Sequence, residues 1–266
     1  MITIAAFIKL VRYELVYEKR KTGTFTINPY DLFMLEMLMK LKKDSGCRIA
    51  CITMGPMECM DAVRRIIAFG ADEAFLVSDP RFSGSDTFAT SHILTKSLKS
   101  INQTIDIIAF GEKSVDGETG QVPVGVAGLL GIQCITGVRE ICEVSKENIL
   151  LKRQFNGRLE IMEAINPCGL VFKGFTTKEP TISLIRIKQT KGYDPIILDA
   201  DTIGIDKGYY GQEGSKTVVK NAVNTISKRD VIFLEGTLDA KAEAFRRLLS
   251  GNKHIIESSK EGGGYD

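Results

Sequence analysis

Residues 111–125 read GEKSVDGETGQVPVG and join two apolar runs. The run at 105–110 has the length and composition of a buried strand, and the run at 122–130 those of a short helix. A glycine-rich loop between a strand and a helix often holds phosphate groups, because the first N–H groups of the helix lack intrahelical partners and favour an anion. The stretch therefore predicts a strand–loop–helix unit that is either a phosphate-binding loop or an ordinary glycine-rich turn.

Four residues of this loop bear on the choice. Gly117 and Gly120 lack a β-carbon, so they would allow the backbone to turn sharply and to approach a ligand closely. Thr119 is a candidate cap for the helix, and Pro123 suits its first turn. These residues favour a helix whose first N–H groups face the loop.

Two carboxylates in the loop argue against a bare phosphate cradle. Asp116 and Glu118 lie on either side of Gly117, and two negative charges would repel a phosphate group. They fit better if one of them accepts hydrogen bonds from ribose hydroxyls, or if they serve to order the loop.

The composition is that of an ordinary globular protein, with 44% apolar and 26% charged residues in a chain of 266. A formal net charge of +2 is too small to indicate nucleic acid or a membrane surface as a partner. No apolar run of about 18 residues is present, so no membrane span is expected. The start, MITIAAFIKLV, is predicted to be a first strand, and a cytoplasmic location is expected.

The chain has six cysteines, without a CxxC pair, and only two histidines. Free buried thiols in a reducing cytosol explain these cysteines better than disulfides or zinc ligands do. No acid–base pair, activated nucleophile or metal cluster stands out in the sequence. We therefore predict no catalytic residue and no metal site.

Apolar runs and amphipathic segments alternate along the first half of the chain. Strands are predicted at 2–8, 48–54, 74–77 and 105–110, and helices at 29–43, 57–69, 87–101 and 122–130. Strands that alternate with helices at this spacing are typical of parallel sheets with right-handed crossovers. The predicted fold class is α/β, with a mostly parallel, doubly wound sheet.

The pattern changes after Gly131. Residues 134–144, 148–154 and 159–164 are expected to form antiparallel strands, because Asn156-Gly157 is a strong hairpin signal. We expect an α/β domain at 1–190 that includes this antiparallel extension. Residues 191–266 are expected to form an extended C-terminal arm with a terminal helix and a flexible tail.

The predicted helix at 29–43 begins with favourable residues and is unusually apolar. Asn28 is a good N-cap, Pro29 fits the first helical position, and Asp31 complements the positive end of the helix dipole. The helix carries more apolar residues than a single buried stripe needs. It is either buried on most sides or meets another chain, and its methionines favour the second explanation.

Several motifs in a fixed order resemble one family. They are INPYD at 27–31, MGP at 54–56, IIAFGADEAFLVSD at 66–79, the stretch at 111–125, and KRQFNG at 152–157. Together they resemble the β subunit of an electron-transfer flavoprotein, clearly to about residue 180 and more weakly beyond it. The resemblance implies a Rossmann-like sheet that binds an adenine nucleotide.

The resemblance also implies which residues line the nucleotide pocket and its phosphate-binding loop. Main-chain contacts are expected to dominate at the apolar positions, and the sequence departs from the usual family pattern at Val124. The implied residues are Phe7, Asn28, Pro29, Tyr30, Asp31, Met54, Gly111, Val115, Asp116, Gly117, Glu118, Thr119, Gly120, Gln121, Val122 and Val124.

Two classes of this family differ in their ligand. Ordinary members hold AMP as a structural ligand, whereas a second class holds FAD and divides the electron pair of NADH, and the compact DGETGQVP loop is nearer to this bifurcating class. The implied function is an electron carrier that is active only with an α subunit and an FAD-dependent dehydrogenase of the acyl-CoA or 2-hydroxy acid type, with ferredoxin as a possible low-potential acceptor. The alternative from another class is a nucleotide-binding regulatory module without a redox role.

Overall fold

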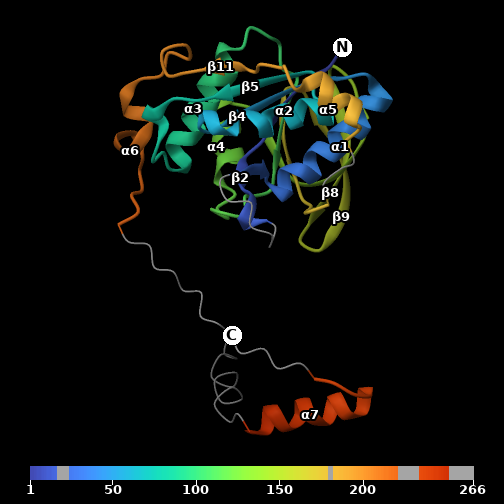
Figure 1. The fold of residues 1–266 in the computed structure, drawn as a ribbon. Coiled ribbons are helices and arrows are strands. Elements are labelled where there is room, and N and C mark those ends of the chain that lie inside the picture. Colours follow the sequence, from blue (N-terminus) through green and yellow to red (C-terminus); the bar gives the residue numbers. More distant parts are fainter. Residues whose placement is uncertain (17–23, 179–181, 221–233, 252–266) are drawn as a thin grey trace, which may run out of the picture. The chain divides into compact units, whose positions relative to one another are not determined.

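The computed structural model describes residues 1–16, 24–178, 182–220 and 234–251 (Figure 1). The chain divides into two compact units, Met1–Val218 and Val219–Asp266. The first unit extends well beyond the boundary expected after residue 190. The flexible tail expected at 258–266 lies outside the described residues.

The first unit is built on a nine-stranded sheet with the order β11-β5-β4-β1-β6-β10-β7-β8-β9. All neighbours from β11 to β7 are parallel, while β7, β8 and β9 pair in antiparallel fashion. This confirms the predicted α/β class and the antiparallel extension. The strands are β1 (Thr3–Phe7), β4 (Arg48–Met54), β5 (Glu73–Val77), β6 (Ile107–Gly111), β7 (Gln133–Val144), β8 (Asn148–Phe155), β9 (Arg158–Ile165), β10 (Cys168–Phe172) and β11 (Ile196–Leu198).

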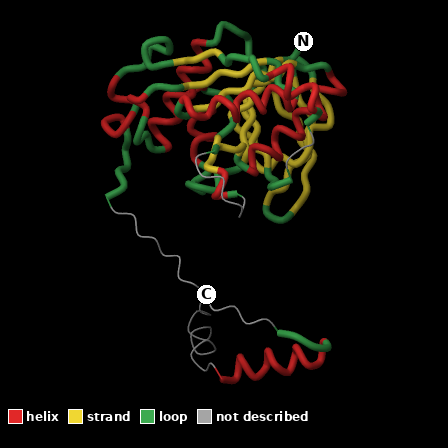
Figure 2. Tube along the Cα trace, in the orientation of Figure 1, coloured by secondary structure: helices red, strands yellow, loops and turns green. Residues whose placement is uncertain are grey.

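Helices cover both faces of the parallel part of the sheet, and the strands form the layer between them (Figure 2). The sheet has two apolar clusters because successive strand side chains point to opposite faces. In β1, Ile4 and Ala6 belong to the cluster that includes α1 (Pro29–Ser45) and α2 (Met60–Phe69). Ala5 and Phe7 belong to the cluster that includes α3 (Thr87–Ser100) and α4 (Gln121–Leu130).

Helix α1 is buried within its own chain on most sides. Its residues Met34, Leu35 and Leu38 are fully buried, and Met37 and Met39 pack against the same cluster. The apolar composition of the helix is therefore explained by burial on most sides, the first of the two explanations considered above. No second chain is needed to cover these methionines. The helix begins at Pro29 and ends before Gly46, which has the left-handed conformation expected at a helix end.

Residues after 190, expected to form an extended arm, return to the sheet. Strand β11 pairs in parallel with β5 at the edge of the sheet. The segment that follows it contributes Ala200, Ile203, Ile205 and Tyr210 to the cluster under α3. These apolar residues stand singly between polar ones, so no continuous run marked them as core in the sequence.

Short elements complete the first unit. A small antiparallel pair, β2 (Leu10–Arg12) and β3 (Phe25–Ile27), precedes α1. The remaining elements are one-turn 3-10 helices and two short α-helices. They are η1 (Tyr13–Leu15), η2 (Met57–Cys59), η3 (Pro80–Phe82), η4 (Lys207–Tyr209), α5 (Leu184–Thr190) and α6 (Gly211–Gly214).

The second unit contains the helix α7 (Leu238–Gly251), as predicted for this stretch. The helix carries an ion pair between Glu243 and Arg247, one turn apart on its exposed surface. In the described parts of the chain, every helix is too short or too polar to cross a membrane.

Candidate functional site

The predicted site residues come together at one edge of the sheet. Strands β4, β1 and β6 are adjacent and parallel, so their carboxyl ends lie side by side. Helix α1 begins beside the end of β6, and the loop after β6 leads into α4. The strand ends supply Phe7, Met54 and Gly111, the start of α1 supplies Asn28, Pro29, Tyr30 and Asp31, and the loop with the first turn of α4 supplies Val115, Asp116, Gly117, Glu118, Thr119, Gly120, Gln121, Val122 and Val124.

Asp31 links the ends of two strands from the first turn of α1. Its Oδ2 accepts a hydrogen bond from the amide of Lys9 at 2.8 Å, and its Oδ1 accepts one from the amide of Gly111 at 3.0 Å. The carboxylate is almost completely buried, and this burial raises its pKa to about 6 although three hydrogen bonds favour the charged form. Asp31 therefore acts beyond its own helix, where it was expected to complement the helix dipole.

Gly111 allows this close approach because it has no side chain. A β-carbon there would collide with Oδ1 of Asp31 and would lie 2.7 Å from the carbonyl carbon of Tyr30. Real β-carbons do not come so close to backbone atoms, so another residue would force strand and helix apart. The predicted importance of a glycine here thus has a packing cause.

The side chain of Asn28 binds the backbone of the loop after β6 instead of capping its own helix. Its Nδ2 donates to Oδ2 of Asp31 at 3.1 Å and to the carbonyl of Lys113 at 2.8 Å, while its Oδ1 accepts from the amide of Val115 at 3.2 Å. The residue occupies the N-cap position of α1, but its side chain makes no capping hydrogen bond. The capping role predicted for this side chain is wrong, because buried acceptors and donors of the loop use it fully.

Tyr30 and Pro29 contact the segment that follows β10. The ring of Tyr30 meets Phe175 edge-on, with ring centroids 5.1 Å apart, and the ammonium of Lys113 lies 5.6 Å from its centroid. The carbonyl of Pro29 accepts a hydrogen bond from the amide of Thr176 at 3.3 Å. These contacts fix the start of α1 against the chain that leaves the sheet.

The two loop carboxylates are both paired with lysines. Asp116 forms an ion pair with Lys9 at 2.8 Å, and Glu118 forms one with Lys113 at 3.3 Å. Burial would raise the pKa of Asp116, but hydrogen bonds from Lys9 and Ser114 outweigh it and hold the pKa below its usual range. The carboxylates thus order the loop, the second of the two roles considered above, and their charge is balanced locally.

The start of α4 differs in detail from the prediction. Gly120 is the N-cap, with a left-handed φ of 61°, and no side chain caps the helix, so the capping role expected for Thr119 is wrong. The second left-handed position is Glu118, with a φ of 52°, whereas Gly117 has no such conformation. The N–H groups of Gln121 and Val122 open α4 without intrahelical acceptors.

A cleft of about 470 Å³ opens beside this helix start. It lies between the loop after β6 and a wall formed by β7, the end of β8 with Asn156, and the end of β10. The site prediction did not include the residues of this wall. The NG turn and the end of β10 were visible in the sequence, but nothing local showed that they face the loop. Its lining residues are Glu112, Lys113, Glu118, Thr119, Gly120, Val124, Thr136, Gly137, Gln154, Phe155, Asn156, Val171 and Lys173.

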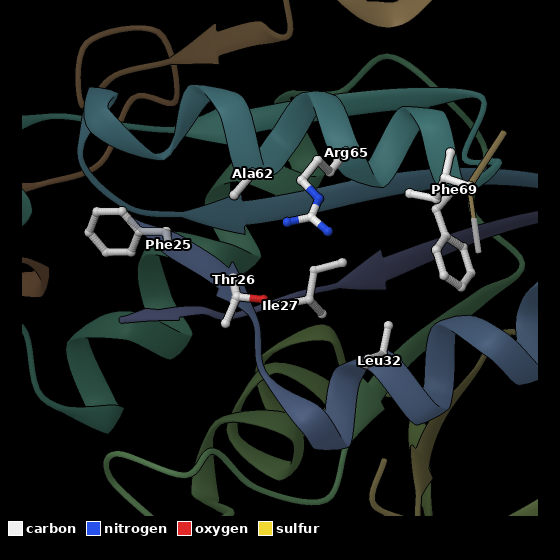
Figure 3. A pocket seen from close by; sticks show the side chains of 8 residues that line it. Phe25, Thr26, Ile27, Leu32, Ala62, Arg65 and Phe69 are labelled. Atoms are coloured by element: carbon white, nitrogen blue, oxygen red, sulfur yellow. The ribbon is translucent and has the colours of Figure 1, made fainter. Parts of the chain in front are cut away.

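A second hollow is far smaller, with a volume of about 20 Å³. It lies between β3, α1 and α2, and Arg65 extends from α2 toward Thr26 and Ile27 (Figure 3). Such a volume holds about one water molecule, so this hollow cannot take a nucleotide. Within the described residues, no group of three histidine, cysteine or acidic side chains is placed to hold a metal ion.

Comparison with known proteins assigns the family. The sequence pattern of the electron transfer flavoprotein domain matches residues 16–171. Protein FixA of Azotobacter vinelandii is 36% identical over 238 residues, which cover 88% of this chain and 81% of that protein. The chain therefore belongs to the electron transfer flavoprotein family.

Further relatives indicate which subunit the chain resembles. The electron transfer flavoprotein subunit beta of Thermoanaerobacterium thermosaccharolyticum is 31% identical over 86% of this chain and 87% of its own length. The acryloyl-CoA reductase electron transfer subunit gamma of Anaerotignum propionicum is 30% identical over 86% of this chain and 88% of its own length. These matches confirm the resemblance to a β subunit and assign the chain to electron transfer.

Proposed function

We propose that this chain is an electron-transferring β subunit that binds FAD at the loop after β6 and works with an α subunit. The observation that carries the proposal is the cleft of about 470 Å³ directly beside Gly120. Ligand pockets commonly measure about 300–1,000 Å³, so this cleft has room for part of a dinucleotide beyond its phosphates. The relatives, among them an electron transfer flavoprotein subunit beta, support the electron-transfer role and the α-subunit partner.

The residues of the loop suit a diphosphate. The free N–H groups of Gln121 and Val122 and the positive end of α4 favour an anion, and Gly120 leaves the backbone uncovered there. Asp116 and Glu118, which would repel phosphate, are already neutralised by lysines. We infer that the phosphates of the ligand bind to these amides.

The two ends of the ligand would then lie on opposite sides of the loop. The adenosine end would lie over the carboxyl ends of β1 and β4, where Phe7 and Met54 offer mainly their main chain. The flavin end would extend into the cleft toward Phe155 and Lys173. AMP, the alternative ligand, has no flavin end, so it would not extend into this cleft.

A bound flavin supplies the one- and two-electron redox chemistry, and the protein binds it, orients it and limits its contact with water. We infer the bifurcating form of the function, in which electrons from NADH are divided between ferredoxin and an FAD-dependent dehydrogenase. The relative from Anaerotignum propionicum, an electron transfer subunit of acryloyl-CoA reductase, favours the acyl-CoA type over the 2-hydroxy acid type.

The ligand content of the purified complex tests this proposal. The chain is co-expressed with its α subunit, the complex is denatured, and the released nucleotides are separated and quantified. Two FAD per αβ pair are expected. One FAD with one AMP would instead identify the ordinary class, and an adenine nucleotide without any flavin would support the regulatory module.

A further inference from the structure

The side chains of Asn28 and Asp31 are buried and hydrogen-bonded to protein partners. Asn28 is buried with 0% exposure, and each hydrogen-bonding group of its amide has a protein partner. Asp31 accepts from Lys9, Asn28 and Gly111. Burial and these protein partners keep both side chains from a ligand, although the family resemblance implied that both line the pocket.

The partners of Asn28 lie on both sides of Ser114. Its amide group donates to the carbonyl of Lys113 and accepts from the amide of Val115, so one side chain holds two backbone groups of the loop. A single planar amide thereby fixes the course of the backbone at this point. The ion pair of Lys9 with Asp116 holds the next turn of the same loop.

Asp31 ties this arrangement to the rigid part of the fold. Its carboxylate binds the backbone just after β1 and at the end of β6, the two central strands at which the sheet order reverses. Its third hydrogen bond orients the amide of Asn28 so that the nitrogen points at Lys113 and the oxygen at Val115. The position of the loop is therefore set by the two strand ends through these two side chains.

We propose that Asn28 and Asp31 are positioning residues that fix the loop at 113–115 to the ends of β1 and β6 and thereby control how tightly the nucleotide is held, without contacting it. The proposal rests on the proposed function for its ligand. The brace itself, defined as these two side chains and their backbone partners, is a property of the protein alone. It can therefore be measured with and without ligand.

The first test measures the loop in Asn28→Ala. Hydrogen exchange of peptides that cover 111–120 is followed in the full chain after its nucleotide is removed, and nucleotide release from the αβ complex is followed by flavin fluorescence. Loss of two buried hydrogen bonds to the loop is expected to accelerate both processes about tenfold or more. Val63→Ala, a buried truncation in α2, serves as the control for general destabilisation. When each variant is measured at the same interval below its own melting temperature, Val63→Ala should keep both rates at the parental values.

The second test exchanges the two residues, Asn28→Asp with Asp31→Asn. This variant keeps an amide–carboxylate hydrogen bond between the two positions. It removes the donor to Lys113 and leaves one acceptor oxygen for the amides of both Lys9 and Gly111. If the brace is correct, the exchanged pair shows the same faster loop exchange and nucleotide release as Asn28→Ala. Recovery of the parental rates would overturn the brace.

The outcomes separate this inference from the proposed function. Unchanged loop exchange in Asn28→Ala would refute the brace even if the parent complex contains FAD. A parent complex without nucleotide would refute the proposed function, and faster loop exchange in Asn28→Ala would still support the brace as a loop-positioning device.

Discussion

The carboxylate of Asp31 and the amide of Gly111 are joined by a hydrogen bond of 3.0 Å, although the residues are 80 positions apart in the chain. Asp31 lies in the first turn of α1, and Gly111 is the last residue of β6. The bond therefore fixes where the helix begins relative to the end of the strand. The loop after β6 leaves the sheet directly after this junction.

Gly111→Ala is expected to lower the free energy of unfolding by about 1–3 kcal/mol, because the new methyl group has no space beside Asp31 and Tyr30. Urea unfolding followed by circular dichroism measures the change. Gly128→Ala is the control, since Gly128 is exposed inside α4 with no atom within 4 Å of a new β-carbon. That variant is expected to stabilise the chain by up to about 1 kcal/mol. Equal stability for the two variants would contradict the packing argument.

Asp31 also predicts a pH dependence of stability. Its pKa is raised to about 6 in the folded protein, mainly by burial, so the folded state binds more protons than the unfolded state between about pH 4 and pH 6. This contribution is complete below the unfolded pKa and is lost as the pH rises through 6. Relative to Asp31→Asn, the parent should lose roughly 2.5 kcal/mol of unfolding free energy between pH 4 and pH 7. A constant difference between the two proteins across this range would exclude the raised pKa.

The parallel sheet could be predicted from the sequence because its strands are continuous apolar runs, as in β4, separated by helices of regular length. The β8–β9 hairpin was equally visible, since Asn156 and Gly157 both adopt the positive φ that its turn needs. Strand β11 was missed because it has only three residues among polar neighbours. Its place in the sheet is decided by pairing with β5, a partner more than 100 residues earlier, and not by its own pattern.

The meeting of the segments in the candidate site could be predicted, but the partners of their side chains could not. The loop after β6 and the start of α1 do meet, as the motifs implied. Capping rules assigned Asn28 and Asp31 to their own helix because these rules consider only local partners. Their actual partners, Lys113, Val115 and Gly111, are long-range neighbours that only the folded sheet brings within reach.

The exposure and burial of the cysteines predict which thiols react. Cys142 is exposed, whereas Cys51, Cys59 and Cys168 are buried. Burial raises the pKa of Cys59 to about 12 and that of Cys168 to about 11, which keeps both as unreactive thiols. A thiol-specific reagent at neutral pH should therefore modify Cys142 rapidly, as mass spectrometry of the intact chain and its peptides would show. Cys142→Ser should remove the fast phase, and fast modification of Cys59 would contradict the buried placement.

Two glycines of the loop after β6 should respond differently to substitution. Gly120 is left-handed, and a β-carbon there would lie 3.1 Å from the carbonyl of Glu112, whereas Gly117 has only the Oγ of Ser114 within reach, at 3.7 Å. Gly120→Val should cost about 1–2 kcal/mol of backbone strain and empty the nucleotide site, as measured by flavin content after gel filtration. Gly117→Ala should retain the ligand. Parental flavin content in Gly120→Val would show that the phosphates do not bind at the amides proposed for them.

Asp86 connects the last residues of the first unit to the start of α3. Its Oδ1 caps α3 by accepting from the amide of Ala89 at 3.0 Å, and its Oδ2 accepts from the amides of Lys216 and Thr217, both at 2.8 Å. Asp86→Ala should lower the free energy of unfolding by about 0.5–2 kcal/mol through the lost cap alone. It should also free the backbone at Lys216, so limited trypsin treatment under native conditions is expected to cleave there faster. Asp44→Ala, at an exposed position near the end of α1, should leave cleavage unchanged, and equal rates in both variants would show that Asp86 does not hold this segment.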